Sequence, residues 1–112
     1  MFKRRARFVF IGPAAVVELA VGCAREHVAQ WIEADRLERD APAAAARDPV
    51  AWADVCVILD DGPAPAGKPC RRWQVGAPED PRTHDRLLEA LQGAVGGLRM
   101  LARSDRGDGR PT

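Results

Sequence analysis

Asp60, Asp61 and Asp80 are the side chains in this sequence best placed for acid-base or cation chemistry. Asp60 and Asp61 directly follow the apolar run 55–59, and Asp80 precedes the last apolar segment. Carboxylates at the end of a strand can hold a divalent cation, but aspartate in this position also commonly caps a turn. We expect Asp60 and Asp61 to cap a turn, and we keep all three aspartates as candidate catalytic residues.

Cys23 and His27 form a second pattern with a known chemical use. They are one helical turn apart, and Cys70 and His84 could complete a set of metal ligands. However, Cys23 and His27 also lie on the apolar stripe of a predicted helix, where a buried thiol and a hydrogen-bonded core histidine are more common. We therefore predict no metal and no cofactor.

Two further segments could bind a ligand or a partner. Gly12-Pro13-Ala14-Ala15 lies between a predicted strand and a predicted helix, where backbone N–H groups often hold an anion, although it offers one glycine and no hydroxyl or cation. Arg71-Arg72-Trp73 could stack on a partner, although such a trio is usually a solvated sheet edge. These segments are the candidate ligand-binding and interaction residues.

The elements that must position these residues follow from the hydrophobic periodicity. Residues 7–12, 54–61 and 70–75 are predicted strands, the third of them near a sheet edge. A long helix is predicted from Ala14 to just before Pro42, because Trp31 and Ala34 continue its apolar stripe. Residues 41–49 form a linker or a short helix, and Asp48-Pro49 begins a helical turn.

The last helix begins near Asp80 or Thr83, with Pro81 in its first turn. This order of elements predicts a small α/β fold, a two-layer or three-layer parallel sheet of about three to four strands with flanking helices and a long C-terminal helix. Residues 1–103 form a single domain, and residues 104–112 form a disordered polar tail.

Composition excludes several classes of function. Lys and Arg total 17 and Asp and Glu total 16, so a net charge of +1 argues against nucleic-acid binding. Three cysteines cannot all pair, which favours a reducing, cytoplasmic location. Residues 3–23 are similar to a signal peptide ending at Cys23, but Glu18 and Pro13 interrupt an apolar run too short to span a membrane. A lipoprotein anchored through Cys23, with residues 1–22 cleaved, stays as an alternative.

The order of elements resembles that of low-molecular-weight protein tyrosine phosphatases and the related arsenate reductases. The resemblance rests on residues 8–20, residues 53–61 and the segment 73–78, which is similar to the Trp-x-x-x-Asp-Pro segment that supplies the general acid of that family. The family has a catalytic cysteine at the end of its first strand, then five loop residues, an arginine and a serine. These positions fall on Phe10, Val16 and Val17 of this sequence.

The resemblance implies that the chemistry of the family has been lost. Phenylalanine offers no nucleophile, and valine cannot donate two hydrogen bonds to an oxyanion. The general acid falls on Ala77, unless Asp80-Pro81 takes its place. The segment between the first helix and Trp52 is shorter than in the family, which implies that the second strand of the family is missing.

We therefore expect a catalytically inactive, phosphatase-like module that binds another protein or a second copy of itself, without nucleic-acid or membrane partners. The first strand and residues 53–63 are also similar to nucleoside deoxyribosyltransferase-like folds, but the glutamate-bearing Gly-Thr segment of those enzymes is absent. The alternative is accordingly a small enzyme that acts on a phosphorylated or nucleoside substrate through Asp60, Asp61 or Asp80.

Overall fold

A computed structural model describes residues 5–39 and 48–105, with side chains described as far as residue 98. The predicted linker residues 41–47 and the tail residues 106–112 lie outside the described residues. Seven elements follow one another along the chain: β1 (Ala6–Gly12), α1 (Ala14–His27), β2 (Ile32–Glu38), α2 (Pro49–Trp52), β3 (Val55–Ile58), β4 (Cys70–Arg72) and α3 (Arg82–Asp105).

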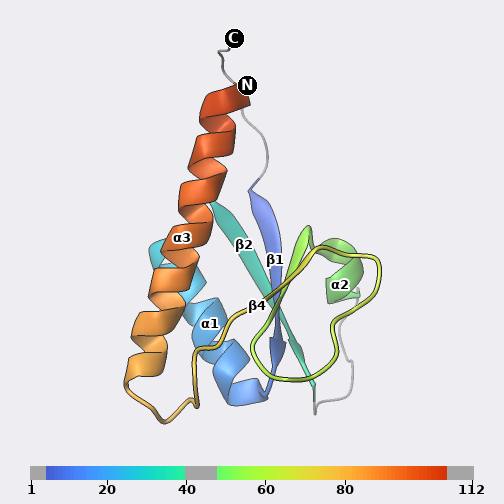
Figure 1. Cartoon of the computed structure of the whole chain (residues 1–112), viewed down its shortest axis with the longest axis vertical. Coiled ribbons are helices and arrows are strands. Elements are labelled where there is room, and N and C mark those ends of the chain that lie inside the picture. Colours follow the sequence, from blue (N-terminus) through green and yellow to red (C-terminus); the bar gives the residue numbers. More distant parts are fainter. Residues whose placement is uncertain (1–4, 40–47, 106–112) are drawn as a thin grey trace.

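The four described strands form one parallel sheet in the order β2-β1-β3-β4 (Figure 1). Successive residues of a strand point to opposite faces, and β1 separates its side chains accordingly. Phe8 and Phe10 belong to the cluster that contains α1 and α3, whereas Val9 and Ile11 belong to a second cluster beside α2. Helices therefore cover both faces, and the predicted α/β fold with a parallel sheet is confirmed.

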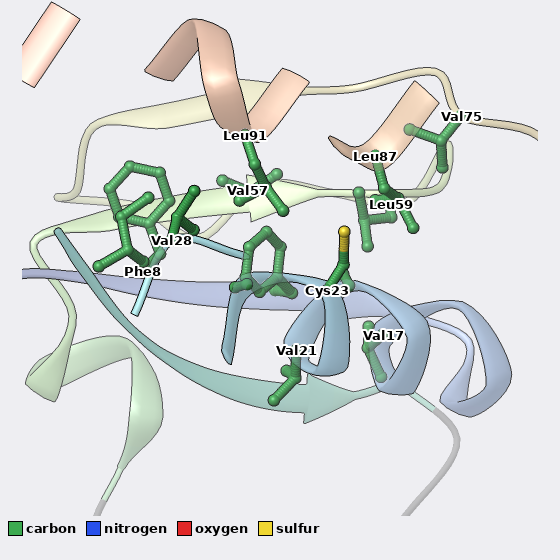
Figure 2. Close-up of a cluster of buried hydrophobic side chains, with 14 of the residues drawn as sticks. Phe8, Val17, Val21, Cys23, Val28, Val57, Leu59, Val75, Leu87 and Leu91 are labelled. Atoms are coloured by element: carbon green, nitrogen blue, oxygen red, sulfur yellow. The ribbon is translucent and has the colours of Figure 1, made fainter. Parts of the chain in front are cut away.

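The larger core lies between the sheet and the helices α1 and α3 (Figure 2). Leu87 and Leu91 of α3 and Val17 of α1 are fully buried against Phe10 and Val57 of the central strands. Each such side chain contributes about 1.5 to 3 kcal/mol of burial free energy. This packing fixes α1 against α3, and it therefore positions side chains that the two helices present at their junction.

The residues predicted to start helices act as caps. Asp48 accepts a hydrogen bond from the backbone N–H of Val50 at 3.0 Å, with Pro49 in the first turn of α2. Asp80 accepts a hydrogen bond from the backbone N–H of Arg82 at 2.9 Å, at the start of α3. Thr83 is instead fully buried, and its hydroxyl donates to the carbonyl of Ala77 at 2.5 Å.

The prediction of one helix from Ala14 to Pro42 is wrong, because α1 ends at His27 and the chain returns as β2. The backbone N–H groups of Trp31 and Ile32 both donate to the carbonyl of Val28, at 2.9 and 3.0 Å, and close the turn between the two elements. Among the described residues β2 pairs with β1 alone, so it is an edge strand. It is half-buried and carries charged residues, and its sequence therefore also fits the exposed face of a helix. The expected loss of the second strand is therefore also wrong.

The remaining elements agree with the prediction in position but differ in length. β3 and β4 are shorter than the predicted strands, and β4 lies at a sheet edge as expected. α3 continues to Asp105, two residues beyond the predicted domain boundary at 103. Among the described residues, no helix combines the length and apolar character that a membrane span requires.

Candidate functional site

The carboxyl edge of the sheet brings together residues that follow different strands. Because all four strands are parallel, Gly12, Arg39, Asp60 and Arg72 lie at the same edge, where α/β proteins usually bind ligands. The backbone N–H of Arg39 donates to the carbonyl of Gly12 at 3.0 Å. Asp60 and Asp61, two of the candidate catalytic residues, follow β3 at this edge.

Asp60 is fully engaged in holding a turn. Arg39 donates through Nε to one carboxylate oxygen at 2.7 Å, and the backbone N–H of Gly62 donates to the other oxygen at 3.0 Å. The hydrogen bond from Arg39 holds the pKa of Asp60 below its usual value, although partial burial opposes this effect. Asp60 therefore caps a turn as an ionised residue, and each of its oxygens already accepts one hydrogen bond from the protein.

Two arginines complete the packing around this turn. Arg39 also donates to the carbonyl of Pro63 at 2.9 Å, and Arg72 donates to the carbonyls of Asp60 and Gly62. A Cβ atom at Gly62 would lie 2.5 Å from the guanidinium of Arg39, so a side chain there would displace the guanidinium from its present position. Asp61 is exposed and makes no hydrogen bond or ion pair with the described residues.

Asp80 belongs to the start of α3 and not to the cluster around Asp60. Besides capping the helix, it forms ion pairs with Arg82 at 3.7 Å and Arg86 at 3.8 Å. The backbone hydrogen bond from Arg82 lowers the pKa of Asp80, and the two guanidinium groups act in the same direction. No contact among the described residues joins Asp80 to Asp60 or Asp61, so the three candidate acids are not assembled into one site.

The segment Gly12-Pro13-Ala14-Ala15 passes from strand to helix without an intervening loop. Only Pro13 separates β1 from α1, and it has an extended conformation. The N–H groups of Val16 and Val17 both donate to the carbonyl of Pro13, at 3.1 and 3.0 Å. The five-residue loop implied by the family resemblance is not formed, because β1 continues through position 12 and α1 begins at position 14.

The predicted interaction residues have three different environments. Arg72 supports the turn after Asp60, and Trp73 packs against Phe10 with ring centroids 6.0 Å apart. Arg71 is exposed and has no hydrogen bond or ion pair to the described residues. Of this trio, Arg71 alone has its charged group unpaired within the part of the chain that the structure describes.

The most concentrated set of ligating side chains lies between α1 and α3. Cys23 and His27 come from the last turns of α1 and His84 from the first turn of α3, and their ligating atoms lie within 4.8 Å of one another. The imidazoles of His27 and His84 are 6.2 Å apart, measured between ring centroids. We refer to these three residues as the Cys-His cluster.

The sequence contained part of the signal for the Cys-His cluster. Cys23 is 2% exposed, as expected for the apolar stripe, but the side chain of His27 is 36% exposed and is not a core histidine. Cys70 takes no part, because it packs beside α2 and its thiol lies 3.3 Å from the carbonyl oxygen of Lys68. The approach of His84 to α1 depends on the tertiary packing of α3 and leaves no trace in local spacing.

A pocket of about 270 Å³ adjoins the Cys-His cluster, lined by Glu18, Leu19, Gly22, Cys23, Glu26 and His84. Burial raises the pKa of the Cys23 thiol, and the charge of Glu26 raises it further. The thiol is therefore protonated in the free chain at neutral pH. Cleavage before Cys23, as the lipoprotein alternative requires, would remove β1 and its pairing with both β2 and β3.

Comparisons of this chain with family models, with curated proteins and with solved structures found no match.

Proposed function

We propose that this chain is a catalytically inactive, phosphatase-like module that acts by binding a protein partner. The observation that carries the proposal is the burial of Phe10 and Val16, the positions on which the nucleophile and the anion-binding arginine of the resembled family fall. Phe10 is 0% exposed in the centre of β1, and Val16 is 3% exposed in the first turn of α1. Neither side chain can attack or bind a phosphoryl group.

The positions of the three candidate acids also support a role without catalysis. General acid-base catalysis requires a carboxyl group that can reach its substrate with a free oxygen. Each oxygen of Asp60 already accepts one hydrogen bond, from Arg39 or from Gly62, and Asp80 caps α3. Asp61 makes no hydrogen bond or ion pair with the described residues, but a single exposed carboxylate without a second group offers little catalytic power.

The partner that suits this fold best is an acidic segment in extended conformation. Among the described residues β4 pairs with β3 alone, so its other edge can accept a further strand by backbone hydrogen bonding. The guanidinium of Arg71 has no hydrogen bond or ion pair to the described residues and lies on this edge strand, and the charge of Arg72 is adjacent. These two cations favour a partner with carboxylates.

Turnover of a generic aryl phosphate tests the absence of catalysis. We expect the full chain to hydrolyse the compound no faster than buffer, and the Asp80→Asn variant to behave identically. Glu79→Gln serves as the control, because it removes one negative charge from an exposed side chain beside Asp80. Activity in the wild-type protein that is lost in Asp80→Asn would overturn the proposal.

Charge exchange at Arg71 tests the binding edge. We expect a short peptide of alternating glutamate and valine to bind more tightly than its lysine counterpart, and Arg71→Glu to weaken that binding about fivefold to tenfold. Arg25→Glu makes the same charge change at an exposed position of α1, remote from β4 in the fold. Equal weakening by both variants, or no preference for the acidic peptide, would contradict a binding site at β4.

A further inference from the structure

We propose that the Cys-His cluster is a binding site for a transition-metal ion of the zinc class, held between α1 and α3. The inference is independent of the proposed binding at β4, since the Cys-His cluster lies between α1 and α3 and contains no residue of β4. It rests on three observations: the ligand set, the way in which two packed helices position it, and the acidic pocket beside it.

Two different structural constraints bring the ligands together. Cys23 and His27 are separated by one turn of α1, so both side chains lie on the same side of that helix. His84 is placed by the packing of α3, where Leu87 and Leu91 are fully buried in the shared core. Figure 2 shows the sulfur of Cys23 directed from α1 toward the side on which Leu87 lies.

The spacing of the three ligands fits a small tetrahedral ion after a modest movement. With Zn–S and Zn–N bonds of ordinary length, ligand atoms in a tetrahedral site are about 3.4 to 3.6 Å apart. The present atoms lie within 4.8 Å of one another, so closure requires a shift of about 1 Å. The side chains of His27 and His84 are 36% and 48% exposed, and they have the freedom to make this shift.

The chemistry of the ligands selects the class of metal. One thiolate and two imidazoles suit a borderline-soft ion such as Zn²⁺ or Co²⁺, whereas Mg²⁺ and Ca²⁺ require oxygen ligands. On binding, the Cys23 thiol releases its proton to solvent and forms the S–metal bond as a thiolate, and each neutral imidazole donates one nitrogen lone pair. Three protein ligands leave a fourth position for water or a small ligand, as in sites with open coordination.

The surroundings of the cluster favour a cation. Glu18 and Glu26 line the adjoining pocket, and the partial negative charge at the C-terminal end of α1 opposes the partial positive charge at the start of α3. A carboxylate also lies near each imidazole, since Glu26 is 3.6 Å from His27 and Asp85 is 3.9 Å from His84. At these distances the carboxylates add negative charge beside both rings without a hydrogen bond to either of them.

Titration of the reduced full-length protein with Co²⁺, followed by competition with Zn²⁺, tests the site. We expect a thiolate-to-cobalt charge-transfer absorption that Zn²⁺ displaces and that Cys23→Ala abolishes. His84→Gln changes a half-exposed side chain and should leave the fold intact while weakening Co²⁺ binding at least about tenfold. Far-ultraviolet circular dichroism establishes that each variant is folded before its titration is interpreted.

Cys70→Ser is the matched thiol control, because Cys70 lies beside α2 and outside the Cys-His cluster. We expect this variant to bind Co²⁺ with unchanged affinity and absorption. The proposal is overturned if wild-type protein gives no thiolate-to-cobalt absorption, if Cys70→Ser removes it, or if folded His84→Gln binds Co²⁺ as tightly as wild type. The histidine variant keeps the test decisive if Cys23→Ala, which alters the core, does not fold.

Discussion

Asp60 stands at the end of β3, where α/β proteins commonly place ligand-binding groups, yet each of its carboxylate oxygens already has a protein donor. Asp80 is likewise occupied as a helix cap. At the scale of single residues, the sequence correctly predicted that Asp60 caps a turn and that Asp80 starts a helix, because these roles depend on local backbone geometry. It could not predict Arg39 as the partner of Asp60, since β2 was interpreted as part of a helix.

The Asp60→Asn variant should therefore lose stability at neutral pH, by about 1 kcal/mol for a partly exposed ion pair. The pKa of Asp60 is lowered in the folded state, so its stabilising contribution is present above the unfolded pKa of about 3.9 and is lost as the pH falls through the folded value. Urea denaturation of both proteins between about pH 2 and about pH 7 measures the difference in their free energies of unfolding. It should be largest at neutral pH and disappear in acid.

Asp61→Asn provides the control for this pH dependence, because Asp61 is exposed and makes no contact with the described residues. Its stability should follow that of wild type at every pH. If Asp61→Asn lost as much stability as Asp60→Asn, the cause would be the net charge of the protein and not the turn that Arg39 holds.

At the scale of elements, burial decides which segments could be recognised. β1 and β3 are central strands covered on both faces, so each has a continuous apolar run that predicts a buried parallel strand. β2 is an edge strand, and its alternating charges and apolar residues fit a helical stripe as well as a strand. The helix α3 was predicted correctly because Leu87, Leu91 and Val95 repeat along one buried face.

α3 depends on packing more than on its intrinsic helical tendency. Gly93, Gly96 and Gly97 each cost about 1 kcal/mol relative to alanine, so contacts with the core must hold the helix in place. We expect Leu91→Ala to lower the free energy of unfolding by about 2 to 5 kcal/mol, because Leu91 is fully buried. Leu88→Ala, on the same helix but only partly buried, should cost clearly less.

Denaturant titration of the Leu91→Ala and Leu88→Ala variants distinguishes packing from helix propensity. Both substitutions change leucine to alanine within the same helix, so any difference between them reflects burial. Equal losses of stability, or a negligible loss in Leu91→Ala, would contradict the importance assigned to the α1–α3 core.

At the scale of the whole molecule, the Cys-His cluster lies apart from the carboxyl edge of the sheet, where enzymes with a parallel α/β sheet usually place their active sites. The carboxyl edge of the sheet is occupied by structural contacts of Asp60 and two arginines, and Phe10 fills the centre of β1. The Cys-His cluster lies instead at the junction of α1 and α3. The sequence suggested Cys23 and His27 as a pair that Cys70 and His84 could complete, but the approach of His84 and the absence of Cys70 from the cluster come from long-range packing that no local pattern contains.

We propose that the ligand chemistry of this molecule lies at the junction of α1 and α3, where the Cys-His cluster binds a metal ion. The thermal unfolding midpoint with and without excess Zn²⁺, compared between wild type and His84→Gln, tests this most directly. A ligand that binds only the folded chain stabilises it, so we predict a rise of several degrees in wild type and a much smaller rise in His84→Gln. The same rise in both proteins, or none in wild type, would contradict the claim.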